Sequence, residues 1–161
     1  MIFVTIGAQE PFDRLIKAMD QLAPMLSDTT VVAQVYQTNY KAKNILTFDF
    51  LTPSEYSSYF DKASLIVSHA GMGTIISALV KEKPILVVPR QAKYGETRND
   101  HQVSTAKVFE LLHYVHVAYS VAELKLKLEE LLLQNHKKVN KIGRYASAEL
   151  IQSIESNILH I

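Results

Sequence analysis

Cysteine is absent from the 161 residues of the chain. Without cysteine there is no disulfide framework, no thiolate ligand for a metal and no thiol nucleophile. This excludes small disulfide-stabilised domains and cysteine-dependent enzymes, and it fits a reducing compartment. Strong compositional bias is lacking too, because 48% of the residues are apolar and 20% are charged. These fractions argue against a disordered, collagen-like or low-complexity chain.

Long apolar runs are also missing. The longest purely apolar stretch covers only a few residues, as at Ile85–Val88, whereas a membrane-spanning helix needs about 20. The chain begins MIFVTIGAQE, without a basic region, and passes directly into a strand-like segment. This start does not resemble a secretory signal. We therefore expect a cytoplasmic protein.

A large net charge is the third feature that the chain lacks. It has 17 lysines and arginines against 16 aspartates and glutamates, which leaves a formal charge of +1. We therefore expect no nucleic-acid partner, because binding to nucleic acid depends on a strongly basic surface. The length predicts a single domain over residues 1–161 that can bury a core.

Two hydrophobic patterns alternate along the chain. Short β-branched runs predict six strands, at residues 2–6, 31–36, 45–48, 64–68, 85–88 and 114–119. Helical spacing predicts helices that start near residues 11, 52, 74, 99 and 120, and a last helix over about 138–159. This alternation predicts a doubly wound, Rossmann-like α/β domain, with a parallel sheet of about six strands covered on both faces.

The loops at the strand ends are the expected ligand-binding loops. Doubly wound sheets bind ligands at the carboxyl ends of the strands, where the strand order reverses. The loops in question follow Ile6, Ser68 and Val88.

The first of these loops is Gly7–Pro11. A small residue at the strand end allows backbone N–H groups and a helix N-terminus to face an anion. A tight turn that needs Gly7 for its backbone angles explains the same sequence equally well.

The second loop, SHAGMGT, contains two glycines between an apolar strand and a helix. Gly71 and Gly73 permit a phosphate to approach the backbone, Thr74 adds a hydroxyl group, and His69 can donate a hydrogen bond to a diphosphate or exchange protons. Alternatively, the two glycines serve only packing and turns.

The third loop runs from Arg90 to Gln102 and mixes cations with amides. This mixture suits a sugar, whose hydroxyl groups need donors and acceptors, and a pyrophosphate, which needs arginine or lysine. In the alternative interpretation, the segment is a solvated loop in which Asn99 caps a helix. Asp100 and His101 have no further ligand at metal-binding spacing, so we expect no metal site.

Three helix starts have the spacing of a capping box, in which a side chain and a glutamate or glutamine satisfy each other's backbone N–H groups. Thr52 and Glu55 form one such pair, with Pro53 suited to the first turn. Asn99 and Gln102 form the second, and they predict a helix that begins at Asn99. Ser120 and Glu123 form the third, for the helix that starts near residue 120.

Together these segments resemble the C-terminal domain of glycosyltransferase family 28. The resemblance rests on VTIGAQ, PFDRLIKAMD, VSHAGMGTIISAL, KPILVVPR and GETRNDHQ. It extends from Met1 to about Phe109 and is strongest for the short, stand-alone bacterial polysaccharide glycosyltransferases of the PssE/EpsF type. These are similar to the small catalytic subunit of the two-part eukaryotic UDP-N-acetylglucosamine transferase of dolichol-linked oligosaccharide synthesis.

The resemblance implies the nucleotide-sugar-binding half of a GT-B enzyme. It implies a UDP-sugar donor, transfer of galactose, glucuronic acid or N-acetylglucosamine, and an acceptor saccharide linked to undecaprenyl diphosphate. A membrane-anchored partner subunit would supply the acceptor-binding half at the inner face of the cell membrane, in exopolysaccharide or capsule synthesis. Enzymes of this kind usually invert the anomeric centre and use no metal or other cofactor.

The resemblance also implies which residues bind the donor. In the first loop, which faces the diphosphate or the acceptor, they are Gly7, Ala8 and Gln9. In the second loop, which lies against the diphosphate, they are His69, Gly71, Met72, Gly73 and Thr74. In the third they are the sugar ligands Asn99, Asp100, His101 and Gln102, with Arg90 and Arg98 as phosphate or acceptor contacts.

One position departs from the family pattern. Relatives in the wider family carry a glutamate in the helix after the glycine loop, where it binds the ribose hydroxyl groups, and the corresponding position here is Ser77. A serine cannot accept two hydrogen bonds as a carboxylate does, which affects donor affinity or the choice of nucleotide. The catalytic base commonly comes from the acceptor half, so none is assigned here, and His69 is only an outside candidate.

The C-terminal helix and the function itself leave alternatives open. An apolar stripe in that helix packs either on the sheet of this chain or on a partner subunit, and consists of Ile142, Ala146, Leu150, Ile154 and Ile158. A non-catalytic binding or activating subunit of such a pair is one rival function. Another UDP-sugar enzyme of the same half-fold, such as an epimerase, is the second, although such chains are about twice as long.

Overall fold

The computed structural model of the chain describes residues 1–26, 29–133, 142, 152 and 156. Within this part, a sheet of six parallel strands forms the centre of the molecule. The strands are β1 (Ile2–Thr5), β2 (Val31–Gln34), β3 (Leu46–Phe48), β4 (Leu65–Ser68), β5 (Ile85–Val87) and β6 (His116–Val117). Each of them lies inside a range predicted from the sequence, so the prediction of six strands is confirmed.

The strand order is β3-β2-β1-β4-β5-β6. The chain builds outward from β1 in one direction and then returns to build outward from β4 in the other. β1 and β4 therefore lie side by side where the order reverses, with Thr5 opposite Ser68 at their carboxyl ends. The doubly wound fold is confirmed, and the reversal brings the first two predicted loops together.

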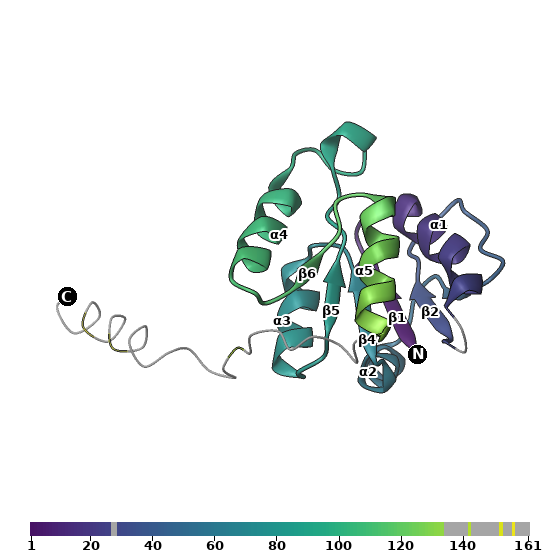
Figure 1. Cartoon of the computed structure of the whole chain (residues 1–161), viewed down its shortest axis with the longest axis horizontal. Helices are drawn as coiled ribbons and strands as arrows, with labels where there is room; N and C mark the ends of the chain where they lie inside the picture. Colours follow the sequence, from purple (N-terminus) through teal and green to yellow (C-terminus); the bar gives the residue numbers. More distant parts are fainter. Residues whose placement is uncertain (27–28, 134–141, 143–151, 153–155, 157–161) are drawn as a thin grey trace.

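Helices cover both faces of this sheet (Figure 1). One face packs against α1 (Asp13–Leu22) and α5 (Val121–Leu133). The other packs against α2 (Pro53–Lys62), α3 (Met72–Val80) and α4 (His101–Leu111). Two short 3-10 helices, Ala23–Met25 and Ala92–Tyr94, complete the described elements. The strands β1, β2, β4 and β5 are buried on both sides, which explains why they read as apolar runs in the sequence, whereas β3 at the edge of the sheet is largely exposed.

Of the three predicted capping boxes, those at α2 and α4 have opposite outcomes, and at the start of α5 the Glu123 N–H donates to the Ser120 hydroxyl at 3.2 Å. At α2 the box is confirmed: the Thr52 hydroxyl accepts from the Glu55 N–H at 3.3 Å, and the Glu55 carboxylate accepts from the Thr52 N–H at 2.9 Å. At α4 the prediction was wrong, because the helix begins at His101 and its N-cap, Asp100, makes no side-chain capping bond. The Gln102 amide oxygen instead accepts from the backbone of Arg90 at 3.1 Å.

Two further sequence predictions concern helix boundaries. α3 begins at Met72, two residues before the predicted start, because Gly71 occupies the N-cap position and Gly73 is already helical. The predicted helix over 138–159 lies outside the described residues, apart from residues 142, 152 and 156. In the described part of the chain, none of the helices has the length and apolar character needed to cross a membrane.

Candidate functional site

A cleft of about 710 Å³ opens at the carboxyl ends of β1, β4 and β5. This volume falls in the range of about 300–1,000 Å³ that is usual for small-molecule sites. All three predicted loops line it, with Gly7, Ala8 and Gln9 from the first, His69, Gly71, Met72, Gly73 and Thr74 from the second, and Arg90, Arg98, Asn99, His101 and Gln102 from the third. The fold thus brings together residues from segments that are up to 95 positions apart in the sequence.

Two predicted site residues do not line the cleft. Ser77 is exposed on α3, and its hydroxyl group donates to the carbonyl of Gly73 at 2.7 Å. Serine in a helix commonly makes this bond to the carbonyl one turn earlier. The Asp100 carboxylate accepts from the Ala92 N–H at 2.8 Å and holds the third loop together. Both side chains are therefore engaged in local structure.

The cleft also contains polar residues that the sequence analysis missed, namely Glu10, Thr97 and Thr105. Glu10 directly follows Gln9 in the first loop, and Thr97 directly precedes Arg98 in the third. Thr105 lies one helical turn after His101, so helical periodicity would have placed it on the same face of α4.

The imidazole of His69 lies between the first and second loops. A Cβ atom on Gly71 would come within 2.2 Å of Nε2 of this ring, and one on Gly7 would come within 3.0 Å of its Cε1. The Gly7 backbone also has a φ of +79°, which confirms the interpretation as a tight turn. The space beside these two glycines is therefore taken by His69, whereas a Cβ atom on Gly73 would meet no atom within 4 Å.

Burial, followed by the positive charge of Arg90, lowers the pKa of His69 from 6.5 to about 4, although the Thr5 backbone acts in the opposite direction. The imidazole is therefore neutral at pH 7. In this form one ring nitrogen donates a hydrogen bond and the other accepts one.

We expect this lowered pKa to make the protein less stable at mildly acidic pH. The unfolded chain takes up a proton on His69 near pH 6.5, whereas the folded chain does so only near pH 4, so stability falls as the pH drops through this interval. The ring lines an open cleft, and we therefore expect a loss of about 2 kcal/mol rather than the full value of the shift.

Urea unfolding of the wild type and of His69→Gln at pH 7 and pH 4.5 measures this loss. The wild type should lose more stability between the two pH values than the variant, because the carboxylates titrate in both proteins and their effects cancel. Parallel pH profiles for the two proteins would contradict the prediction.

Arg90 connects the first and third loops from below the cleft. It is 4% exposed, and its Nη2 donates to the carbonyls of Ile6 at 2.9 Å and Glu10 at 2.6 Å. Its guanidinium centre lies 5.0 Å from the centroid of the Phe12 ring. Burial lowers the pKa of Arg90, while Glu10 and Glu96 oppose this lowering. Arg90 therefore fixes the shape of the loops and places a positive charge beneath the cleft.

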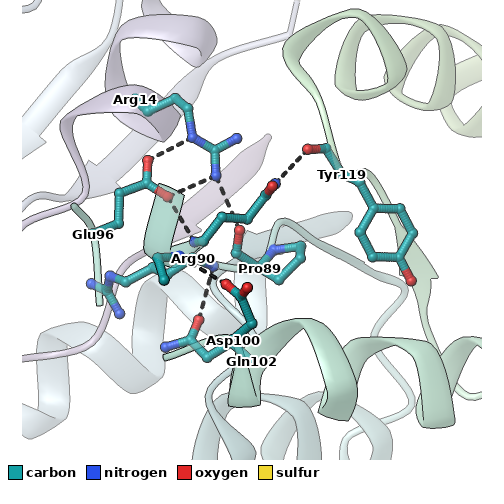
Figure 2. Close-up of polar contacts among 9 residues, drawn as sticks. Arg14, Pro89, Arg90, Glu96, Asp100, Gln102 and Tyr119 are labelled. Atoms are coloured by element: carbon teal, nitrogen blue, oxygen red, sulfur yellow. Dashed lines mark hydrogen bonds and ion pairs between the residues drawn. The ribbon is translucent and has the colours of Figure 1, made fainter. Parts of the chain in front are cut away.

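A second arginine attaches the third loop to α1, as Figure 2 shows. Arg14 binds both carboxylate oxygens of Glu96, at 2.6 and 2.9 Å, and donates to the carbonyl of Pro89 at 3.0 Å. The Glu96 carboxylate also accepts from the Gln91 N–H at 3.0 Å. The loop after β5 is thus held against α1 by a partly buried ion pair.

The N-terminus of α4 presents an amide and an imidazole to the cleft. The Asn99 side-chain oxygen accepts from the His101 N–H at 3.1 Å and lies 2.5 Å from its Nδ1. An amide oxygen only accepts, so Nδ1 carries the hydrogen and Nε2 remains free. The oxygen of Gln102 is occupied by Arg90, which leaves its amide nitrogen as the donor for a ligand.

The family model described as the glycosyltransferase family 28 C-terminal domain matches residues 1–156 of the chain. The chain belongs to this family. Its cleft lies at the point of strand reversal, which is the usual ligand site of a doubly wound sheet, and is lined by glycines, amides and cations.

A curated relative is the UDP-N-acetylglucosamine transferase subunit ALG13 of Candida albicans, which is 33% identical over 86 residues. The match covers 53% of this chain but only 28% of that relative.

Two solved structures share the fold. The NMR solution structure of ALG13 superposes with a TM-score of 0.60 at 22% identity, covering 85% of this chain and 87% of that one. The UDP-GlcNAc 2-epimerase from Neisseria meningitidis superposes with a TM-score of 0.64 at 13% identity, covering 99% of this chain and 44% of that one. At these identities the likeness concerns the fold, which is that of one half of a GT-B glycosyltransferase.

Proposed function

We propose that the chain is the donor-binding domain of a UDP-sugar-dependent hexosyltransferase. It transfers galactose, glucuronic acid or N-acetylglucosamine from UDP to a saccharide linked to undecaprenyl diphosphate, in exopolysaccharide or capsule synthesis. The observation that carries this proposal is the cleft at the β1–β4 reversal, which three loops with the sequence pattern of the family line together. The curated relative named above is itself a UDP-N-acetylglucosamine transferase subunit.

The residues of the cleft divide into two groups in this proposal. The start of α3, with Gly73 and Thr74, faces the diphosphate, because the free N–H groups and the dipole of a helix N-terminus favour an anion. Asn99, His101 and Gln102 bind the hydroxyl groups of the donor sugar through their free donors and acceptors. Charge that develops on the leaving UDP is stabilised by the first group.

The acceptor-binding half comes from a membrane-anchored partner subunit in this proposal. The cleft lies along the edge of one sheet and is open to solvent, so a second half is required to enclose the reacting atoms from the other side. The partner holds the chain at the inner face of the cell membrane, where a lipid-linked acceptor is available. The reaction inverts the anomeric centre and proceeds only when the two subunits are together.

A second candidate function is that of a non-catalytic binding subunit of such a pair. The observation in its favour is Ser77, which stands where relatives carry a ribose-binding glutamate, has no carboxylate, and donates its hydroxyl hydrogen to the Gly73 carbonyl. Donor binding without turnover in the reconstituted complex would identify this function.

Calorimetric titration with UDP tests the proposed function. We expect the wild type to bind UDP and Gly73→Trp to show no measurable binding, because the indole would fill the cleft from a position with no neighbour within 4 Å. Val80→Trp is the matched control, since Val80 is exposed on α3 outside the cleft and should leave UDP affinity unchanged. Equal affinity in the wild type and Gly73→Trp would place the nucleotide elsewhere.

If the isolated chain binds no UDP at millimolar concentration, the titration is repeated with the co-expressed partner. Binding in the complex would mean that the partner completes the site. Absence of binding there too would reject the donor-half function.

A further inference from the structure

We propose that Glu10 is the general base of the transfer reaction. The inference rests on the proposed function and adds to it the one role that no residue of the chain has so far been given. In a direct displacement, a base must reach both the attacking hydroxyl group of the acceptor and the space beside the donor sugar.

Glu10 lies where two cavities meet. A side pocket of about 260 Å³ adjoins the cleft between the first and third loops, and it is lined by Glu10, Pro11, Gly95, Glu96, Thr97 and Arg98. Three of these residues, Glu10, Thr97 and Arg98, also line the cleft. An acceptor that enters through the side pocket would therefore meet the donor at these residues, and a carboxylate at this junction can contact both substrates.

The Glu10 carboxylate is free to act as a base. Among the described residues that line the cleft it is the only carboxylate, its residue is exposed, and no described side chain forms an ion pair with it. The other carboxylate of the side pocket, Glu96, is already bound by Arg14 and by the Gln91 N–H. Glu96 therefore serves the loop, and Glu10 remains available.

The backbone at Glu10 is held in place. Its carbonyl accepts from Arg90 at 2.6 Å, and Arg90 is itself buried and bonded to Ile6 and Gln102. Pro11 follows and restricts the chain further. A base must be positioned to be effective, and these contacts fix its point of attachment while the side chain remains in solvent.

The two histidines of the cleft are less well placed for this role. The His69 ring lines the cleft but not the side pocket, and it fills the space beside Gly7 and Gly71. His101 lines the cleft but not the side pocket. His101 remains the rival that an experiment has to separate from Glu10.

The proposed reaction is a direct displacement of UDP by the acceptor hydroxyl group. The acceptor oxygen forms a bond to the anomeric carbon of the donor sugar, and the bond from that carbon to the diphosphate oxygen breaks. The proton of the acceptor hydroxyl group passes to the Glu10 carboxylate, and UDP leaves with the electron pair of the broken bond. In the absence of an acceptor, water takes the place of the hydroxyl group and the donor is slowly hydrolysed.

Hydrolysis of the donor by the full chain tests the proposal. UDP release is measured with UDP-galactose, UDP-glucuronic acid and UDP-N-acetylglucosamine, alongside calorimetric UDP affinity. We expect Glu10→Gln to lower the rate of hydrolysis by about 100-fold, because removal of a general base costs about 10²–10⁴-fold. UDP affinity should be unchanged or higher, since a negative charge near the diphosphate is removed. Glu10→Asp should restore part of the rate.

Glu129→Gln on α5 is the matched control, because it removes an exposed carboxylate that lines neither the cleft nor the side pocket and should leave both readouts unchanged. Loss of hydrolysis in His101→Gln with full activity in Glu10→Gln would assign the base to His101 and overturn the proposal. Parallel loss of UDP affinity and rate in Glu10→Gln would also overturn it, because the residue would then be structural.

Two results distinguish a failure of the donor-half function from a failure of the Glu10 proposal. A wild type that binds none of the donors, with or without its partner, rejects the donor-half function before hydrolysis is considered. A wild type that binds a donor and releases no UDP, both alone and in the complex with its partner, rejects Glu10 alone, because a base in this chain would activate water in the completed site.

Discussion

Replacement of Arg90 by methionine is expected to lower the free energy of unfolding by about 3 kcal/mol. The carbonyls of Ile6 and Glu10 would lose a charged donor at 2.9 and 2.6 Å, and a buried acceptor left without a partner costs about 1–3 kcal/mol. Methionine replaces most of the aliphatic part of the side chain, so the loss reports on the hydrogen bonds rather than on an empty space.

Urea unfolding measures this loss, with Arg98→Met as the control. Arg98 is in the same loop but is exposed, so its replacement should change stability by less than about 0.5 kcal/mol. A loss below 1 kcal/mol in Arg90→Met would show that Arg90 does not hold the first loop in place. In that case the positioning of Glu10 would need another explanation.

Gly71→Ala is expected to lower the affinity for UDP at least tenfold and the stability by about 2 kcal/mol. The new Cβ atom would stand 2.2 Å from Nε2 and 2.6 Å from Cε1 of His69, distances at which the ring must move. Gly7 also flanks the ring, because a Cβ atom at that position would come within 3.0 Å of Cε1. It therefore moves into the cleft or strains the second loop, and overpacking of this kind costs about 1–3 kcal/mol.

Gly73→Ala provides a control of opposite sign. Its Cβ atom would meet nothing within 4 Å, and Gly73 lies in the first turn of α3, so alanine should raise stability by about 0.5–1 kcal/mol. The double variant His69→Ala/Gly71→Ala should recover part of the stability lost in Gly71→Ala, because the obstructing ring is gone. Equal losses in Gly71→Ala and the double variant would show that the cause lies in the backbone.

Both predictions depend on the same property of the cleft, which is that side chains of the protein itself hold its loops together. Segments that lie far apart in the sequence are brought into contact by three groups of residues, which are Arg90, His69 and the Arg14–Glu96 pair. Their contacts are made within the chain and shape the cleft. A preshaped site of this kind spends less binding energy on ordering its loops.

The sequence by itself determined the strands, their alternation with helices and the three loops of the site. β-Branched runs, helical spacing and the Thr52–Glu55 capping box act over a few residues, so they can be recognised without knowing the rest of the chain. Alternation of strands and helices then predicts a parallel sheet and places ligand-binding loops at its carboxyl edge.

Only the tertiary structure decided what individual side chains do within these loops. The partners of Arg90 lie 84 and 80 positions away at Ile6 and Glu10, and the neighbour of Gly7 is His69. Such pairs come together only after β1, β4 and β5 have assembled side by side. For this reason the sequence placed Arg90 among the phosphate or acceptor contacts and predicted Gln102 as a helix cap, whereas in the fold these two residues hydrogen-bond to the loops.

The same distinction explains Ser77, Asp100 and Glu10. The first two have the right chemistry for a ligand, yet each finds a closer partner in Gly73 or Ala92. Glu10 carries no motif of its own, and its importance arises from the two cavities that meet beside it. A polar side chain binds whichever partner the fold brings nearest, and cavities exist only between assembled loops, so these assignments required the three-dimensional structure.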